Sequence, residues 1–154
     1  MTRLAGKHAF VTGGRQGIGR GIVDAFVNEG AAVTTCGRGP RPDDLPETVA
    51  WHTLDVTDAA AVAQVVQPMD ILVNNAGVQV EKTVAESTDA DWEAVIGPNC
   101  RGVFNMCRAF IPVMKRGSII NIGSISGQVA DPSMAPYTPP QDSVPGLTRS
   151  IAVA

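Results

Sequence analysis

The sequence predicts an α/β domain with a doubly wound parallel sheet and helices on both of its faces. Three observations support this fold class. Strand-like and helix-like patterns alternate along the 154 residues, as they do in successive strand–helix–strand units. The strand segments are nearly continuous apolar runs, which is typical of strands that helices cover on both faces. A glycine-rich turn connects the first strand to the first helix.

Each expected strand is a short apolar run bounded by turn residues. The five strands are residues 8–12, 31–36, 49–54, 69–74 and 118–123. Because crossovers between parallel strands are right-handed, this order of elements gives a Rossmann-like sheet. Ligands of such sheets bind outside the carboxyl ends of the strands, where the strand order reverses.

The helices are expected at residues 17–29, 58–66, 88–114 and 147–153. In the first, apolar residues recur every four positions from Ile18 to Phe26, which places them on one face. Asp58 can cap the second helix, and Thr88 with Asp91 forms a capping box for the long third helix.

Composition limits the classes of protein to which the chain can belong. With 44% hydrophobic and 18% charged residues, it is not expected to be disordered, and its length suits one domain over residues 1–154. A net charge of −3 favours neither a nucleic-acid nor an anionic-membrane partner. The three cysteines, Cys36, Cys100 and Cys107, show no CxxC spacing, which favours reduced thiols in a cytoplasmic protein over a disulfide framework or a zinc site.

The turn Thr-Gly-Gly-Arg-Gln-Gly-Ile-Gly contains three glycines that a phosphate-binding turn uses for different reasons. Gly13 permits a tight turn, Gly17 lets the backbone approach a pyrophosphate, and Gly19 allows close packing of helix and strand. The first N–H groups of the helix would then face the phosphates. By this pattern alone, an ordinary glycine-rich strand-to-helix turn stays open as an alternative.

Four motifs occur in a fixed order: the glycine-rich turn, Leu-Asp-Val ending at Val56, Asn-Asn-Ala-Gly ending at Gly77, and the pair Ser124 and Tyr137. Together they resemble the short-chain dehydrogenase/reductase family, from about Lys7 to the last residue. The resemblance implies a nicotinamide dinucleotide cofactor and hydride transfer between a secondary alcohol and a ketone. It also implies a small-molecule substrate and a homo-oligomer, a dimer or a tetramer.

By this resemblance, Asp55 and the Val56 backbone contact adenine, whereas Asn74, Ala76 and Gly77 line the nicotinamide-ribose side and Asn74 also braces the central strands. A helix-capping Asp55 and an Asn74 that satisfies local backbone are the structural alternatives. The implied cofactor-binding residues are Gly13, Arg15, Gln16, Gly17, Ile18, Gly19, Arg38, Asp55, Val56, Asn74, Ala76 and Gly77.

The cofactor is expected to be NADP rather than NAD. No acidic residue precedes Asp43 after the second expected strand, where an acid would accept hydrogen bonds from the ribose hydroxyls of NAD. Arg38, helped by Arg15, can instead pair with a 2′-phosphate. A solvated loop charge is the alternative interpretation of Arg38.

The family's reaction centre maps onto three residues. Tyr137, the one tyrosine of the chain, would transfer the hydroxyl proton, and Ser124 would hold the substrate oxygen, with Ser126 as the alternative serine. Asn99, on the long helix, would complete a proton relay.

The family's tyrosine is followed four residues later by a lysine, and here that position is Gln141. A neutral amide cannot supply the positive field that lowers a phenol pKa. Residues before proline avoid helical dihedrals, so residues 138–139 should be extended and the helix should begin near Ser143. Tyr137 would then lie on a loop, out of register with Gln141.

The family's sheet continues after the last helix, so we expect a C-terminally incomplete domain that lacks the last strands and the substrate lid. Three functions therefore stay open: an NAD(P)-dependent oxidoreductase, a catalytically impaired dinucleotide-binding module, and a structural relic that binds no dinucleotide. The apolar face around Val103, Phe104 and Cys107 suits either helix pairing between subunits or burial within one subunit.

Overall fold

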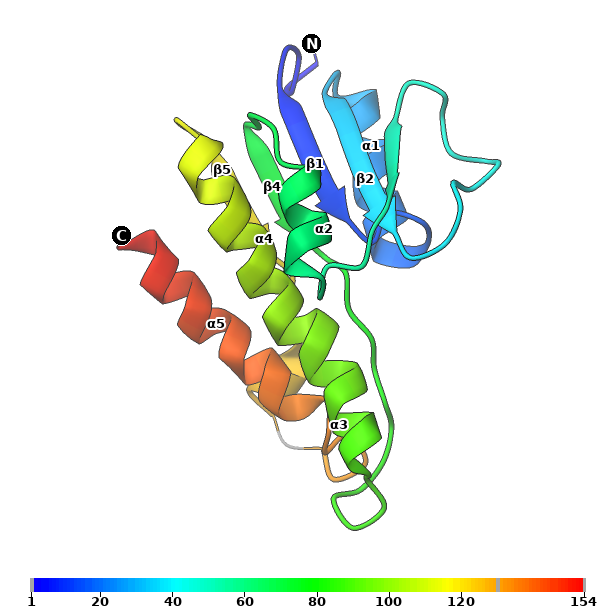
Figure 1. Ribbon diagram of the computed structural model, residues 1–154, viewed down its shortest axis with the longest axis vertical. Coiled ribbons are helices and arrows are strands. Elements are labelled where there is room, and N and C mark those ends of the chain that lie inside the picture. Colours follow the sequence, from blue (N-terminus) through cyan, green and yellow to red (C-terminus); the bar gives the residue numbers. More distant parts are fainter. Residues whose placement is uncertain (1, 130, 154) are drawn as a thin grey trace.

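A five-stranded parallel sheet with the order β3-β2-β1-β4-β5 forms the centre of the computed structural model (Figure 1), which describes residues 2–129 and 131–153. The chain builds β1, β2 and β3 outward in one direction and then crosses to the other side of β1 for β4 and β5. The strand order thus reverses between β1 and β4, which confirms the doubly wound sheet. The strands are β1 (His8–Thr12), β2 (Ala32–Gly37), β3 (Ala50–Thr53), β4 (Ile71–Asn74) and β5 (Ser118–Asn121).

Helices cover both faces of the sheet. Figure 1 shows α2 and α4 in front of it and α1 behind it. The predicted long helix is confirmed as a succession of α3, a π-helical turn η1, α4 and a 3-10 turn η2, so Pro98 lies where the helix is locally widened. The elements are α1 (Gly17–Asn28), α2 (Ala59–Gln64), α3 (Asp89–Ile96), η1 (Gly97–Gly102), α4 (Val103–Phe110), η2 (Ile111–Val113), η3 (Ile125–Gly127) and α5 (Thr138–Ala152). Within the described residues, no helix is both long and apolar enough to span a bilayer.

Each face of the sheet has its own hydrophobic core, because consecutive strand residues point to opposite faces. Phe10 of β1 packs in a cluster with Phe110 of α4, whereas its neighbour Val11 packs in a cluster with Val23 of α1. The residues of the expected apolar face of α4 differ in burial. Val103 and Cys107 are buried within the chain, whereas Phe104 is 46% exposed.

The start of α5 differs from the prediction. We expected an extended Thr138–Pro139 segment, but α5 begins at Thr138 and Tyr137 already has helical dihedrals. Pro139 and Pro140 are the second and third helical residues, where a backbone N–H has no partner within the helix, so the prolines forfeit no hydrogen bond. Tyr137 and Gln141 consequently lie one turn apart on the same side of the helix, and the expectation that they are out of register is wrong.

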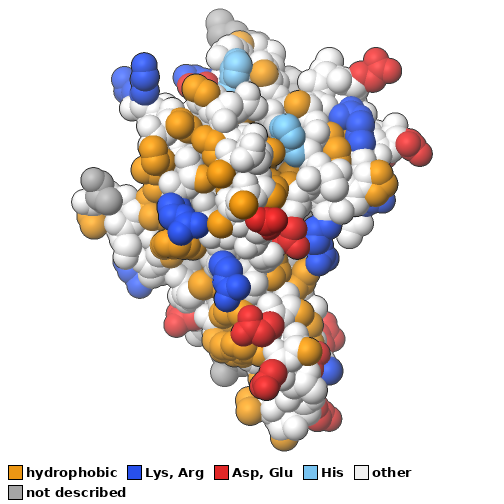
Figure 2. Space-filling view, in the orientation of Figure 1, with side chains coloured by type: hydrophobic (Ala, Val, Ile, Leu, Met, Phe, Trp, Pro, Cys, Tyr) orange, Lys and Arg blue, Asp and Glu red, His pale blue; other side chains and the backbone are white. Residues whose placement is uncertain are grey.

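The capping box at the start of α3 is confirmed, and its Asp91 also forms an ion pair with Lys82. Thr88 accepts a hydrogen bond from the Asp91 N–H, and the Asp91 carboxylate accepts one from the Thr88 N–H. The ammonium of Lys82 lies 2.7 Å from the same carboxylate. The Lys82 ammonium first, and then the Thr88 hydroxyl and N–H, lower the pKa of Asp91 to about 2. In the orientation of Figure 2, acidic side chains gather at the narrow end where Figure 1 places α3.

We expect Asp91→Asn to destabilise the chain at neutral pH by an amount that vanishes in acid. Because the folded-state pKa lies below its ordinary value of 3.8, the ionised carboxylate stabilises the folded state above about pH 4, and this stabilisation is lost as the pH falls through about 2. Urea unfolding of both proteins between pH 2 and 7 measures the difference. A difference that does not depend on pH would contradict this assignment.

Candidate functional site

A cavity of about 640 Å³ opens at the carboxyl ends of the strands, where the strand order reverses. Its size is typical of a site for a small molecule or cofactor. Apart from Asn74, every residue that the sequence assigned to the cofactor lines it. Other lining residues lie in α3 and η1: Glu93, Ala94, Gly97, Pro98 and Arg101.

Gly13, Gly17 and Gly19, three of the four glycines of the turn, each meet a different steric demand. Gly13 and Gly17 have positive φ angles of 73° and 57°, which favour glycine. A Cβ atom on Gly19 would collide with the carbonyl oxygen of Gly13 and the side-chain amide of Asn75, whereas one on Gly17 would meet no atom within 4 Å. The turn is therefore closed toward the protein and open at Gly17, where a ligand can approach the backbone.

The N-terminus of α1 is available to an anion. The cap residue Gln16 makes no side-chain hydrogen bond to the first turn, and this turn has no acidic residue. Gly17, Ile18 and Gly19 of the first turn line the cavity. The unpaired N–H groups and the positive end of the helix dipole therefore favour a negatively charged ligand.

Thr12 joins the glycine-rich turn to the Asn-Asn-Ala-Gly segment. Its hydroxyl oxygen accepts hydrogen bonds from the backbone N–H groups of Asn75 at 3.0 Å and Ala76 at 2.9 Å. The Asn75 side chain donates to the Thr12 carbonyl at 3.0 Å. Sequence analysis assigned no role to Thr12 or Asn75, although both lie inside the motifs that it used.

Asn74 does not line the cavity, in contrast to Ala76 and Gly77. It is 2% exposed, and its amide nitrogen donates to Asn121 at 2.8 Å and to the Cys107 sulfur at 3.3 Å. As the last residue of β4, it points to the α4 face of the sheet. There its hydrogen bond to Asn121 joins β4 to β5.

The Asp55 carboxylate lies at the adenine-side wall implied by the family resemblance. It accepts hydrogen bonds from the Thr57 N–H at 2.9 Å and the Thr57 hydroxyl at 2.7 Å. The Thr57 N–H is the largest cause that lowers the pKa of Asp55, with the Thr57 hydroxyl and the Arg38 charge as further causes, and partial burial opposes them. An ionised acceptor therefore faces the cavity at neutral pH.

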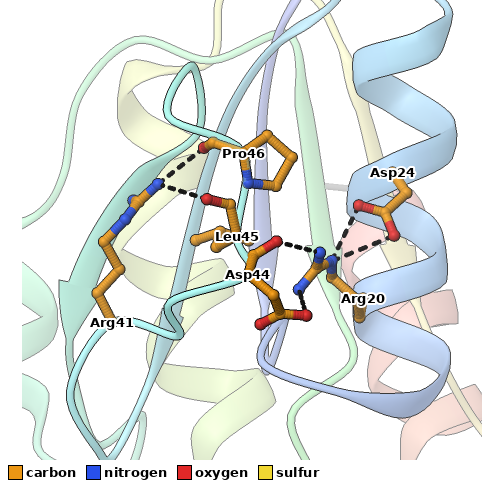
Figure 3. Close-up of polar contacts among 6 residues, drawn as sticks. All are labelled: Arg20, Asp24, Arg41, Asp44, Leu45 and Pro46. Atoms are coloured by element: carbon orange, nitrogen blue, oxygen red, sulfur yellow. Dashed lines mark hydrogen bonds and ion pairs between the residues drawn. The ribbon is translucent and has the colours of Figure 1, made fainter.

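Two arginines fix the loop between β2 and β3, which carries Arg38 (Figure 3). Arg20 of α1 binds the Asp24 carboxylate at 2.9 Å and both the carboxylate and the carbonyl oxygen of Asp44, at 3.0 and 2.7 Å. Arg41 donates to three carbonyl oxygens of the same loop, those of Leu45, Pro46 and Val49.

Arg15 reaches this loop from the glycine-rich turn, and its guanidinium donates to the Pro40 carbonyl at 2.9 Å. Arg15 and Arg38 both line the cavity. They place two positive charges on one side of it, next to the end of β2.

The three residues of the expected reaction centre lie outside the lining of the cavity. Asn99 holds the backbone of Val78, a lining residue, through hydrogen bonds of 2.8 Å to its N–H and its carbonyl oxygen. The Ser124 hydroxyl oxygen accepts the Ser126 N–H at 3.1 Å. Among the hydrogen bonds of the described residues, none joins Asn99, Ser124 and Tyr137 to one another.

Gln141 is 6% exposed, and its side-chain oxygen has no hydrogen-bond partner among the described residues. The turn of α5 that contains Gln141 contacts η1, since the Ser143 hydroxyl lies 3.2 Å from the Cys100 sulfur. The same hydroxyl donates to the Pro140 carbonyl at 2.6 Å. Gln141 is thus a buried amide beside Tyr137, at the position where the family's motif has lysine.

Comparison with the sequence patterns of known protein families shows to which family the chain belongs. The pattern of the family described as short chain dehydrogenase matches residues 7–154. The chain belongs to the short-chain dehydrogenase family. A 3-oxoacyl-[acyl-carrier-protein] reductase from Thermotoga maritima is 33% identical over 97% of this chain and 68% of its own length. An NADP-dependent (R)-specific alcohol dehydrogenase from Lentilactobacillus kefiri is 35% identical over 98% of this chain and 67% of its own length.

Solved structures of short-chain dehydrogenases and their relatives have the same fold. A gluconate 5-dehydrogenase from Burkholderia cenocepacia, in complex with NADP and tartrate, has a TM-score of 0.91 and 30% identity, covering 99% of this chain and 67% of its own. A ligand-free aldohexose dehydrogenase from Thermoplasma acidophilum also has a TM-score of 0.91, with 28% identity, covering 99% of this chain and 62% of its own. The chain thus spans about two thirds of the length of these relatives.

Proposed function

We propose that the chain binds NADP in the cavity and acts as an NAD(P)-dependent oxidoreductase that interconverts a secondary alcohol and a ketone. The observation that carries this proposal is the cradle formed by the glycine-rich turn, the uncapped N-terminus of α1 and the Asn75–Gly77 segment. The cradle has room for a ligand at Gly17, where an added Cβ meets no atom. A pyrophosphate suits both this open backbone and the positive helix end.

Different residues of the cavity would bind different parts of the cofactor. Gly17 and the α1 N-terminus would hold the pyrophosphate, Asp55 and Val56 the adenine, and Ala76 with Gly77 the nicotinamide ribose. When bound, the nicotinamide supplies or accepts the hydride. The names of two relatives support NADP, since one is an NADP-dependent alcohol dehydrogenase and the other is a complex with NADP.

For the chemical step, the assignment implied by the family is Tyr137 as the group that gives or takes the hydroxyl proton and Ser124 as the group that holds the substrate oxygen. Asn99 would support the relay. Tyr137 and Gln141 lie one turn apart along α5, and the positive charge of the family's lysine is absent. The relatives act on substrates as different as a 3-oxoacyl carrier protein and gluconate, and we propose a small-molecule alcohol or carbonyl compound.

A second candidate function is a dinucleotide-binding module with impaired turnover. The buried Gln141 favours it, since its side-chain oxygen lacks a partner and a neutral amide provides no field to stabilise an ionised phenol. Both candidates predict the same binding and differ in turnover.

We further propose a cytoplasmic protein that forms homo-oligomers through the exposed face of its long helix. Phe104 and Ile111 are the large apolar residues that this face exposes.

One experiment separates these functions. The chain is titrated with NADPH while its fluorescence is followed, and NADPH consumption is then measured by its absorbance with a panel of ketones. Saturable binding with consumption supports the oxidoreductase, and saturable binding without consumption supports the impaired module. Absence of saturable binding would contradict both.

We expect Arg38→Ala to weaken NADPH binding about tenfold or more and to leave NADH binding within twofold, because a charge-assisted hydrogen bond to the 2′-phosphate contributes at least about 1.4 kcal/mol. Isothermal titration of both cofactors measures the two dissociation constants. Arg149→Ala, which removes an exposed arginine of α5, is the matched control and should change neither. An equal loss for NADPH and NADH would show that Arg38 does not recognise the 2′-phosphate.

A further inference from the structure

Asn105 of α4 lies directly beneath the wall of the cavity that carries Asp55. The Asn105 side chain is buried, with an exposed fraction of 5%. Its amide nitrogen donates hydrogen bonds to the carbonyl oxygens of Val56 at 3.0 Å and Thr57 at 3.2 Å. Val56 and Thr57 both line the cavity, so one buried amide holds two consecutive residues of its wall.

Arg108 fixes which way this amide faces. A guanidinium nitrogen of Arg108 lies 3.3 Å from the side-chain oxygen of Asn105. Because a guanidinium only donates hydrogen bonds, the amide oxygen must face Arg108 and the amide nitrogen must face the two carbonyl groups. Arg108 is itself placed over the ring of Phe104, 5.1 Å from its centroid, and Figure 2 shows basic and apolar side chains side by side over α4.

The wall is also packed tightly against the helix, so it has little freedom to shift. A Cβ atom on Gly102 would lie 2.5 Å from a methyl group of Val56, and one on Gly97 would lie 3.3 Å from the methyl group of Thr57. Asn105 adds hydrogen bonds to this close fit. From the cavity side, the Asp55 carboxylate holds Thr57, so the turn is fixed from both sides.

We propose that Asn105 is a positioning residue for the adenine half of the dinucleotide: by holding the carbonyl groups of Val56 and Thr57, it fixes the height and angle of the wall that adenine contacts. Arg108 acts through it by orienting the amide. This inference rests on the proposed function, since it assigns a role toward the same cofactor. It adds a residue that does not line the cavity and lies 49 positions from Val56 in the chain.

The test compares Asn105→Leu and Arg108→Ala with the unchanged chain and with Arg149→Ala as the control. Each protein is titrated with NADPH, with 2′,5′-ADP as the adenine half, and with reduced nicotinamide mononucleotide as the other half. We expect Asn105→Leu to weaken NADPH and 2′,5′-ADP about tenfold, by similar factors, since two hydrogen bonds are lost. Binding of reduced nicotinamide mononucleotide should stay within twofold. Arg108→Ala should weaken NADPH and 2′,5′-ADP about threefold.

The outcomes distinguish this inference from the proposed function. If the unchanged chain binds neither NADPH nor 2′,5′-ADP, the proposed function fails and takes the inference with it. If the unchanged chain binds both and Asn105→Leu binds them equally well, or loses both halves of the cofactor by equal factors, the positioning role alone is overturned. Should Asn105→Leu fail to fold, the exposed Arg108→Ala decides by the same selectivity for the adenine half.

Discussion

Gly19→Ala is expected to weaken NADPH binding by about 100-fold, because forcing an extra methyl group into a close-packed region costs about 1–3 kcal/mol. The added Cβ would collide with the carbonyl oxygen of Gly13 and the side-chain amide of Asn75. Neither obstacle can move alone, because the backbone of Gly13 forms the turn and Asn75 is bonded to the Thr12 carbonyl. Relief therefore requires the glycine-rich turn and the Asn75–Gly77 segment to separate, which displaces two sides of the cradle together. Fluorescence titration with NADPH measures the loss.

Gly21→Ala is the matched control for Gly19→Ala. Gly21 lies on the same helix, and a Cβ there meets no atom within 4 Å. An alanine inside a helix stabilises it by about 0.5–1 kcal/mol relative to glycine, so this variant should unfold at slightly higher urea concentration and bind NADPH unchanged. Wild-type affinity in Gly19→Ala would overturn the proposed site.

The elements of the sheet could be predicted from the sequence because apolar burial decides them. All five strands lie where the apolar runs are, and the differences are a few residues at their ends, as with β4, which begins at Ile71 rather than at residue 69. The long helix was predicted from its capping box. The ends of helices and strands are only weakly fixed by hydrogen bonds. Sequence patterns therefore predict the terminal residues of an element less accurately than its centre.

The N-terminus of α5 shows a different limit. The rule that residues before proline avoid helical dihedrals holds on average, but Thr138 and Pro139 both precede a proline and both are helical. The turn before the helix outweighs the rule, since the N–H groups of Tyr137 and Thr138 both donate to the Met134 carbonyl at 3.0 Å. Such a contact depends on where residues 131–137 pack, which no local pattern reveals.

Motifs predicted which segments form the cavity, but they do not encode the direction in which each side chain points. Two consecutive asparagines follow Val73, and the sequence does not say which one faces the cavity. Strand alternation sends Asn74 to the α4 face, and Asn75 faces the turn instead. Asn105 left no signal, because its carbonyl partners lie 48 and 49 residues away in the chain.

Phe110→Ala is expected to lower the free energy of unfolding by about 3–5 kcal/mol, the usual cost of removing a buried phenylalanine ring. Phe110 is fully buried, and its ring meets that of Phe10 edge-on, with centroids 5.2 Å apart. Since Phe10 belongs to the central strand β1, the cavity left by alanine would open between α4 and the middle of the sheet. The α4 helix also carries Asn105, so looser packing here should weaken NADPH binding as well. Urea unfolding at pH 7 measures the change in stability.

Phe104→Ala tests whether burial, rather than the aromatic ring itself, causes this loss. Phe104 lies on the same helix and is 46% exposed, and the guanidinium of Arg108 lies over its ring. An exposed cation–π contact contributes about 0.5–1 kcal/mol, so this variant should lose no more than about 1 kcal/mol in a monomer, and more in the proposed homo-oligomer, where Phe104 would be covered. Equal losses in the two variants would mean that the outer face of α4 is covered in solution, as helix pairing between two copies of the chain requires. The pair of variants therefore tests the core on one side of α4 and the proposed assembly on the other.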